Sequence, residues 1–306
     1  MIQRLLVPLD GSDMAEEALP AAAYLAGKLS ASVTLIHIVE RHAPQEIHGE
    51  RHLTDGAEAE AYLKATATGA FSAELHVEWH VHVTESDDVP RSIVEHIAEC
   101  APDLIVMCSH GSGGLRGFLF GNIAQQVIGR SHTPVLVIRP TPGGSRQPFA
   151  CSRLLAPIDG TPVHEGGLTI AAALGQACGA ELRLVLVVPT LGTLSAERAA
   201  TSRLLPGATS RVLEIAQSEA ANYLGQRVEV LRQQGLNVTA EVRRGDPTET
   251  IVMVARSTGA NMIVLGTHGR SGMDAFWAGS TAPKVSARTH LPLLLVPLDA
   301  GSWSAS

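Results

Sequence analysis

The sequence lacks the features that mark several large classes of protein. Its 306 residues include only 4 cysteines with no CxxC pair. We therefore expect these cysteines to be small buried apolar residues and not to form a disulfide framework. Lysine and arginine number 23 against 30 aspartates and glutamates, a formal net charge of -7, which argues against nucleic acid as a partner. No apolar run approaches the roughly 20 residues of a membrane helix, and the first residues lack a signal peptide's apolar region. We therefore expect a cytoplasmic protein with no membrane partner.

Two common nucleotide-binding signatures are also missing. No G-x-x-x-x-G-K-S/T segment is present, which excludes a P-loop NTPase, and no G-x-G-x-x-G follows the first expected strand. What the chain has is a large apolar share: 45% hydrophobic against 17% charged residues predicts a folded protein with substantial cores. Its length suggests two domains, although one large barrel also fits.

An internal repeat favours two domains. Three segments recur in order: RLLVPLDGS (4–12) as RLLAPIDGT (153–161), DLIVMCSHG (103–111) as NMIVLGTHG (261–269), and HTPVLVI (132–138) as HLPLLLV (290–296). Between the copies, residues 141–148 are rich in proline, glycine and serine, which is typical of a linker. We therefore expect a first domain at 1–140, a linker at 141–152 and a second domain at 153–299.

Within each copy, short apolar segments alternate with longer helical patterns. The expected strands of the first copy are residues 5–9, 32–39, 75–83, 104–108 and 135–138. This order predicts an α/β fold in which each domain has an open parallel sheet flanked by helices. Ser12 and the Thr161 hydroxyl are expected to cap helices, and Pro20 to kink or divide the first helical pattern. We interpret residues 196–236 as a loop followed by a long helix.

Candidate ligand-binding residues follow the strands of the second copy. Open parallel sheets bind ligands beyond the carboxyl ends of their strands, where strand order reverses. Asp159 ends the first strand of this copy after Pro157, and Val187 lies near the end of the second. The fourth strand leads into a glycine loop, and the candidates there are Leu265, Gly266, Thr267, His268, Gly269, Gly279, Ser280 and Thr281. Glycines allow close backbone approach and free amides at a helix N-terminus attract anions, so this loop predicts a phosphate site.

The spacing G-x-x-G, nine residues, G-S/T resembles the ATP-binding signature of the universal stress protein family. The resemblance covers nearly all of both copies, including the opening Pro-x-Asp-Gly-Ser/Thr and the last strand after a proline. It implies a five-stranded parallel sheet of adenine-nucleotide-binding type in each domain, with strand order 3-2-1-4-5. It also implies ATP as the ligand, usually with Mg or another divalent cation. By matching position, Pro157, Asp159 and Val187 would hold the adenosine part, and the glycine loop the phosphates.

The first copy departs from this signature at two positions. Cys108 stands where the first glycine should be, and Asn122 replaces the hydroxyl residue after Gly121, whereas Asp10 and Gly111 are retained. A cysteine tolerates the positive φ of a tight turn poorly. We therefore expect the second copy to bind ATP well and the first to bind it weakly or not at all. Asp10, Gly111, Gly121 and Asn122 are the weaker candidates.

Histidines are concentrated in the first copy, which holds ten of the chain's 13. His76, His80 and His82 alternate along one expected strand, so their rings are expected to share a face. Such spacing suits a zinc ion or a pH sensor. An edge strand with one solvated face gives the same pattern, and we favour that interpretation. The histidines of the 42–52 loop are expected to be exposed to solvent.

The resemblance favours binding of ATP over rapid turnover. His110 and His268 have no nucleophile elbow and no carboxylate placed nearby, so we assign no catalytic residue and expect at most a slow ATPase. Bound nucleotide would favour one conformation and control a surface for an unidentified protein partner. The alternatives are a nucleotide-free scaffold, against which the intact second motif argues, and an adenylating enzyme, whose SGGxDS loop is missing.

The family resemblance also implies how the two copies pair. Members commonly pair through their last strands, so residues 134–138 and 292–296 are expected to meet. This contact would make an internal pseudo-dimer, and a further homodimer is left open.

Overall fold

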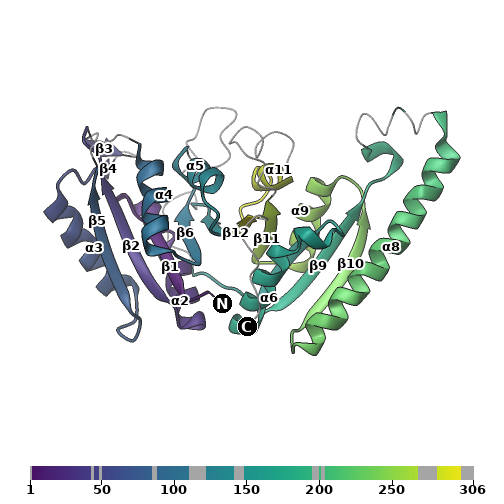
Figure 1. The fold of residues 1–306 in the computed structure, drawn as a ribbon, viewed down its shortest axis with the longest axis horizontal. Helices are drawn as coiled ribbons and strands as arrows, with labels where there is room; N and C mark the ends of the chain where they lie inside the picture. Colours follow the sequence, from purple (N-terminus) through teal and green to yellow (C-terminus); the bar gives the residue numbers. More distant parts are fainter. Residues whose placement is uncertain are drawn as a thin grey trace.

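The computed structural model describes residues 2–42, 45–47, 50–84, 88–109, 122–140, 148–194, 200, 204–267 and 281–297. Its strands form one ten-stranded sheet in the order β10-β9-β8-β11-β12-β7-β6-β1-β2-β5 (Figure 1). The α/β fold class expected from the sequence is confirmed. Among the described residues, no helix combines the length and the apolar character needed to cross a lipid bilayer.

The first half supplies five neighbouring strands of this sheet. They are β1 (Arg4–Pro8), β2 (Ser32–Val39), β5 (Val77–Val83), β6 (Leu104–Cys108) and β7 (Val135–Ile138), parallel to one another. Its helices are α1 (Asp13–Glu16), α2 (Leu19–Leu29), α3 (Gly56–Ala70), α4 (Val89–Cys100) and α5 (Asn122–Arg130). A small hairpin of β3 (Glu46–Ile47) and β4 (Glu50–Arg51) follows β2.

The second half repeats this arrangement. Its strands are β8 (Arg153–Ile158), β9 (Glu181–Val188), β10 (Val238–Arg244), β11 (Met262–Thr267) and β12 (Leu293–Pro297). Its helices are η1 (Pro162–His164), α6 (Gly166–Cys178), η2 (Leu191–Thr193), α8 (Pro206–Gln233), α9 (Pro247–Thr258) and α11 (Thr281–Ser286). In both halves the strands lie in the order third, second, first, fourth, fifth.

The two five-stranded sheets are joined rather than separate. β7 and β12 pair antiparallel, with Leu136 opposite Leu294, so the last strands of the two copies meet. Helices α2 and α6 also pack against each other across this seam. Arg139 strengthens it by donating to the carbonyl oxygens of Ser286 and Thr289, the latter at 2.8 Å.

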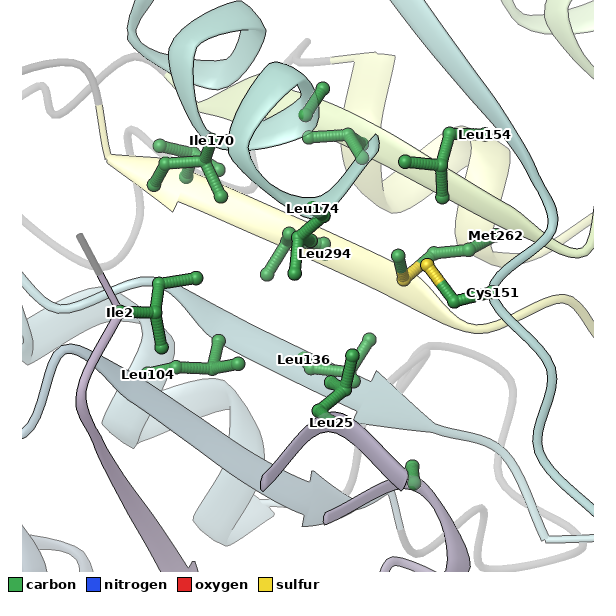
Figure 2. Close-up of a cluster of buried hydrophobic side chains, with 14 of the residues drawn as sticks. Ile2, Leu25, Leu104, Leu136, Cys151, Leu154, Ile170, Leu174, Met262 and Leu294 are labelled. Atoms are coloured by element: carbon green, nitrogen blue, oxygen red, sulfur yellow. The ribbon is translucent and has the colours of Figure 1, made fainter. Parts of the chain in front are cut away.

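Helices cover both faces of the sheet, and both apolar layers run across the seam. Side chains alternate along each strand, so Leu5 and Val7 of β1 face one layer while Leu6 faces the other. Helices α2, α3, α6 and α8 pack on the first face through Leu25, Leu63, Leu174 and Leu224. Helices α4, α5, α9 and α11 pack on the second through Ile93, Val127, Ile251 and Val285. Figure 2 shows leucines of the first layer from both halves side by side.

Several local predictions can be compared with the structure. Ser12 caps α1 as expected, because the Ala15 N–H donates to its Oγ at 3.1 Å. Pro20 lies in the first turn of α2, where a missing N–H breaks no helical hydrogen bond, and α1 and α2 are separate helices. The expected cap by the Thr161 hydroxyl is wrong. The Thr161 N–H instead donates to Asp159 at 2.9 Å, which turns the chain into η1 before α6 begins.

The long helix expected within residues 196–236 is α8, which begins at Pro206. Residues 195–199 and 201–203 of the preceding segment lie outside the described part of the chain.

Truncating one leucine of the seam should destabilise the protein. Leu136 is 1% exposed and lies opposite Leu294, so L136A removes methyl groups that the strand pair cannot easily replace. We expect the free energy of unfolding to fall by about 2–5 kcal/mol in urea titrations. M253A, at an exposed position of α9, should change it by no more than about 0.5 kcal/mol. Equal effects of the two substitutions would contradict a packed seam.

Candidate functional site

The strand order reverses between β8 and β11, which are neighbours in the sheet. Asp159 follows the end of β8, and Gly266 and Thr267 end β11. Val187 lies near the end of β9, and these strands run parallel, so their carboxyl ends share one edge of the sheet. Helix α11 lies at the corresponding edge in Figure 1. The structure thus brings most of the described second-copy candidates to one edge.

Asp159 carries the clearest electrostatic signature at this edge. One of its oxygens accepts the Thr161 N–H at 2.9 Å, and the other lies 2.5 Å from Nδ1 of His164. Burial raises the pKa of this carboxyl group, but the hydrogen bonds from His164 and Thr161 outweigh it, and the net pKa is lowered. Asp159 is therefore an anion at neutral pH.

Other second-copy candidates face inward and offer mainly their backbone. The side chain of Leu265 lies in the apolar layer, 4% exposed. The Thr267 hydroxyl is buried and donates to the Val296 carbonyl at 3.3 Å. Pro157 and Val187 are partly buried strand residues. A ligand would therefore contact their carbonyl groups and the exposed parts of their side chains.

Helix α6 passes directly over the end of β11. A Cβ atom added to Gly167 would lie 3.2 Å from the Gly266 amide nitrogen, so this close approach needs a glycine on the helix. Gly167 is not among the candidates that the sequence motifs predict. The signal that could have found it is the pair Gly166-Gly167 at a helix start, where glycines are otherwise unfavourable.

Most candidates of the glycine loops lie outside the part of the chain that the structure describes. His268, Gly269, Gly279 and Ser280 of the second copy lie outside the described residues, as do Gly111 and Gly121 of the first. Thr281 and Asn122 are the first residues of α11 and α5. Of the loop candidates, the structure therefore fixes only the strand end before each loop and the helix start after it.

The carboxyl edge of the first half has the same turn. Asp10 accepts the Ser12 N–H at 2.9 Å and the Ser12 hydroxyl at 2.6 Å, as Asp159 accepts from Thr161. A cavity of about 50 Å³ lies beside Asp10 and is lined also by Glu40, His52 and Cys108. Ligand pockets begin at roughly 300 Å³. Burial raises the pKa of the Cys108 thiol to about 12, so it is an uncharged wall of this cavity.

Residues 50–54, here called the closing segment, contribute His52 to the lining of this cavity. Leu53 packs on Gly11. The φ of Gly11 is 89°, and a Cβ atom added there would lie 2.8 Å from the Leu53 side chain. Both the backbone conformation and this contact therefore require glycine. The Asp13 N–H donates to the Glu50 carboxylate at 3.1 Å. His52 is only 3% exposed, so the prediction that it is exposed to solvent is wrong. Packing against the core, which sequence spacing does not reveal, buries it.

His37 ties the closing segment to β1. Its Nδ1 lies 2.8 Å from the Leu9 carbonyl and its Nε2 lies 3.3 Å from the Leu53 carbonyl. A neutral imidazole has one N–H, and the shorter contact assigns it to Nδ1. Burial lowers the pKa of His37 and nearby His52 lowers it further, against the opposing effects of the two carbonyls and Asp10. His37 is therefore neutral in the folded protein at neutral pH.

The two histidines within β5 share a face, as predicted. His76 precedes the strand and contacts Glu78 at 2.8 Å. His80 and His82 both face His96 of α4, with ring centroids 6.2 Å and 4.8 Å from that of His96. In the described ranges, no group of three or more His, Cys, Asp or Glu side chains is placed to hold a metal ion. β5 is the edge strand, as expected.

A doubly repeated 3-2-1-4-5 sheet flanked by helices places the chain among the doubly wound α/β proteins. The universal stress protein family matches residues 1–139 and 151–297, so the chain belongs to that family. Universal stress protein Rv2623 of Mycobacterium tuberculosis is 26% identical over 95% of each chain. Universal stress protein MJ0531 of Methanocaldococcus jannaschii is 31% identical over 45% of this chain and 83% of its own. The crystal structure of a universal stress protein from Archaeoglobus fulgidus superposes with a TM-score of 0.67 at 17% identity, covering 96% of each chain, and shares the fold.

Lowering the pH should reduce the free energy of unfolding through protonation of His37. Because its folded pKa is lowered from 6.5, the unfolded chain takes up a proton that the folded protein resists, and stability falls as pH drops below about 6.5. H37N keeps a donor for Leu9 but cannot charge. In urea titrations at about pH 7 and about pH 5, we expect H37N to lose less stability than the parent protein. Equal losses would show that His37 does not contribute.

Proposed function

We propose that the protein binds ATP in its second half and acts in the cytoplasm as a nucleotide-dependent regulator. The observation that carries this proposal is the edge where β8 and β11 end. Anionic Asp159 and the backbone of Gly266 lie there together, at the point where strand order reverses. The family resemblance of the surrounding motif supports ATP as the ligand.

The adenosine part would lie over the ends of β8 and β9. A ribose hydroxyl donates well to a carboxylate, and Asp159 is ionised and 48% exposed at its side chain. Backbone groups around Val187 would bind the base edge, as the resemblance implies. His164, which holds the second oxygen of Asp159, fixes the carboxylate in place before the ligand arrives.

The phosphates would lie beyond β11, between its end and the start of α11. Gly266 allows close approach of a ligand to the backbone, and the first amides of a helix attract anions. The described residues supply no cluster of metal ligands. Mg would therefore be held chiefly by phosphate oxygens and water, as is usual for this ion.

We expect at most slow turnover, as the family resemblance implies. The Thr267 hydroxyl already donates to the Val296 carbonyl, so it is not poised to activate water. The bound nucleotide would instead stabilise one conformation of the chain and thereby control a partner surface. In the first half Cys108 and Asn122 depart from the signature, so we propose unequal halves.

Removing the charge of Asp159 should show which half of the chain binds ATP. Loss of a hydrogen bond to a charged group weakens binding by about 1.5–3 kcal/mol, roughly tenfold or more. We expect D159N to weaken ATP binding by this factor in calorimetric titration. D10N, the matching change in the first half, should leave the measured affinity unchanged. Greater loss in D10N would contradict the assignment to the second half.

A further inference from the structure

Two cysteines lie close together at the amino edge of the sheet, next to the seam. Cys151 comes just before β8, and Cys178 ends α6. Arg153 pairs in register with Glu181, and the Glu181 N–H donates to the Ser152 carbonyl at 2.9 Å. Gly179, with φ of 64°, turns the chain back directly after Cys178. The backbone thus holds the two positions on adjacent segments.

The two side chains interact directly but differ in access to solvent. The Cys151 thiol donates a hydrogen bond to the Cys178 sulfur. Cys151 is 0% exposed, and Figure 2 shows it among the buried apolar side chains. Cys178 is partly exposed. A reagent from solvent therefore meets Cys178 first, with Cys151 behind it.

The charges around the pair favour a thiolate at Cys178. The hydrogen bond from Cys151 lowers the pKa of Cys178, and the Lys28 ammonium of α2 adds to this, while burial opposes both. The same hydrogen bond and burial raise the pKa of Cys151. Cys100 is also partly exposed, yet burial raises its pKa. Since the thiolate is the reactive form, Cys178 is the most nucleophilic of the four cysteines.

We propose that Cys178 and Cys151 form an oxidant-sensitive dithiol that hydrogen peroxide converts to a disulfide. The Cys178 thiolate attacks one peroxide oxygen, the O–O bond breaks, and the other oxygen leaves with a proton as water. Cys178 is then a sulfenic acid. The Cys151 sulfur attacks it, a second water leaves with the Cys151 proton, and the S–S bond forms. The two thiols are oxidised by two electrons, and the peroxide is reduced to water.

The first half of the chain is placed to respond to this step. Tyr24 of α2 hydrogen-bonds to the Cys151 backbone, and its ring contacts Phe149 edge-on at 5.5 Å. Lys28 lies 5.8 Å from the Tyr24 ring centre. Disulfide formation removes the ionisable Cys178 thiol near Lys28 and ties the end of α6 to the start of β8. The covalent connectivity next to the seam therefore changes.

Oxidation of the purified full chain tests the proposal. The protein is treated with a small excess of hydrogen peroxide, its free thiols are blocked with N-ethylmaleimide, and its intact mass and non-reduced peptides are measured. We expect a peptide pair linking Cys151 to Cys178, with a mass about 2 Da below that of the two thiols. Cys100 should be found alkylated, and Cys108 should become alkylated once the protein is unfolded. The melting temperature should rise on oxidation and return on reduction.

Serine variants distinguish the two roles. In C151S, hydrogen peroxide should oxidise Cys178 to a sulfenic acid that dimedone traps. In C178S, Cys151 should stay unmodified. C100S, a change at a cysteine outside the pair, should still form the disulfide. A linkage through Cys100, or two alkylated thiols at Cys151 and Cys178 after oxidation, would overturn the proposal. Should a serine variant fail to fold, the peptide map of the unsubstituted chain still decides.

Discussion

The pairing of β7 with β12 is the contact on which the rest of the structure depends. Each half alone would leave its last strand as an apolar edge, with Leu136 or Leu294 beside unpaired backbone groups. Antiparallel pairing satisfies both edges at once and makes both apolar layers continuous. The strands left at the ends of the sheet, β5 and β10, carry histidine, glutamate and arginine, side chains that discourage further strand addition.

The seam joins halves with the same fold but different carboxyl edges. Asp10 and Asp159 make the same turn with the residue two positions later, so this backbone turn is kept in both. In the first half the closing segment also places Leu53 on Gly11 and His52 in the core. Duplication thus preserves the scaffold of the turn in both halves.

Much of the fold could be predicted because buried parallel strands leave a strong local signal. The apolar runs at 32–39, 104–108 and 135–138 match observed strands residue for residue. The burial of His52 and the pairing of Cys151 with Cys178 could not be predicted, since both depend on contacts between distant segments. The site was predictable as far as the strand ends. Which oxygens of Asp159 are engaged depends on His164, whose orientation no spacing rule gives.

The central claim is that two halves with one fold have unequal nucleotide sites. The most direct measurement is native mass spectrometry of the purified chain with increasing ATP, which counts bound nucleotides per polypeptide. The account predicts saturation at about one nucleotide per chain across the concentrations that fill a specific site. Two equal sites, or no bound nucleotide at all, would contradict it.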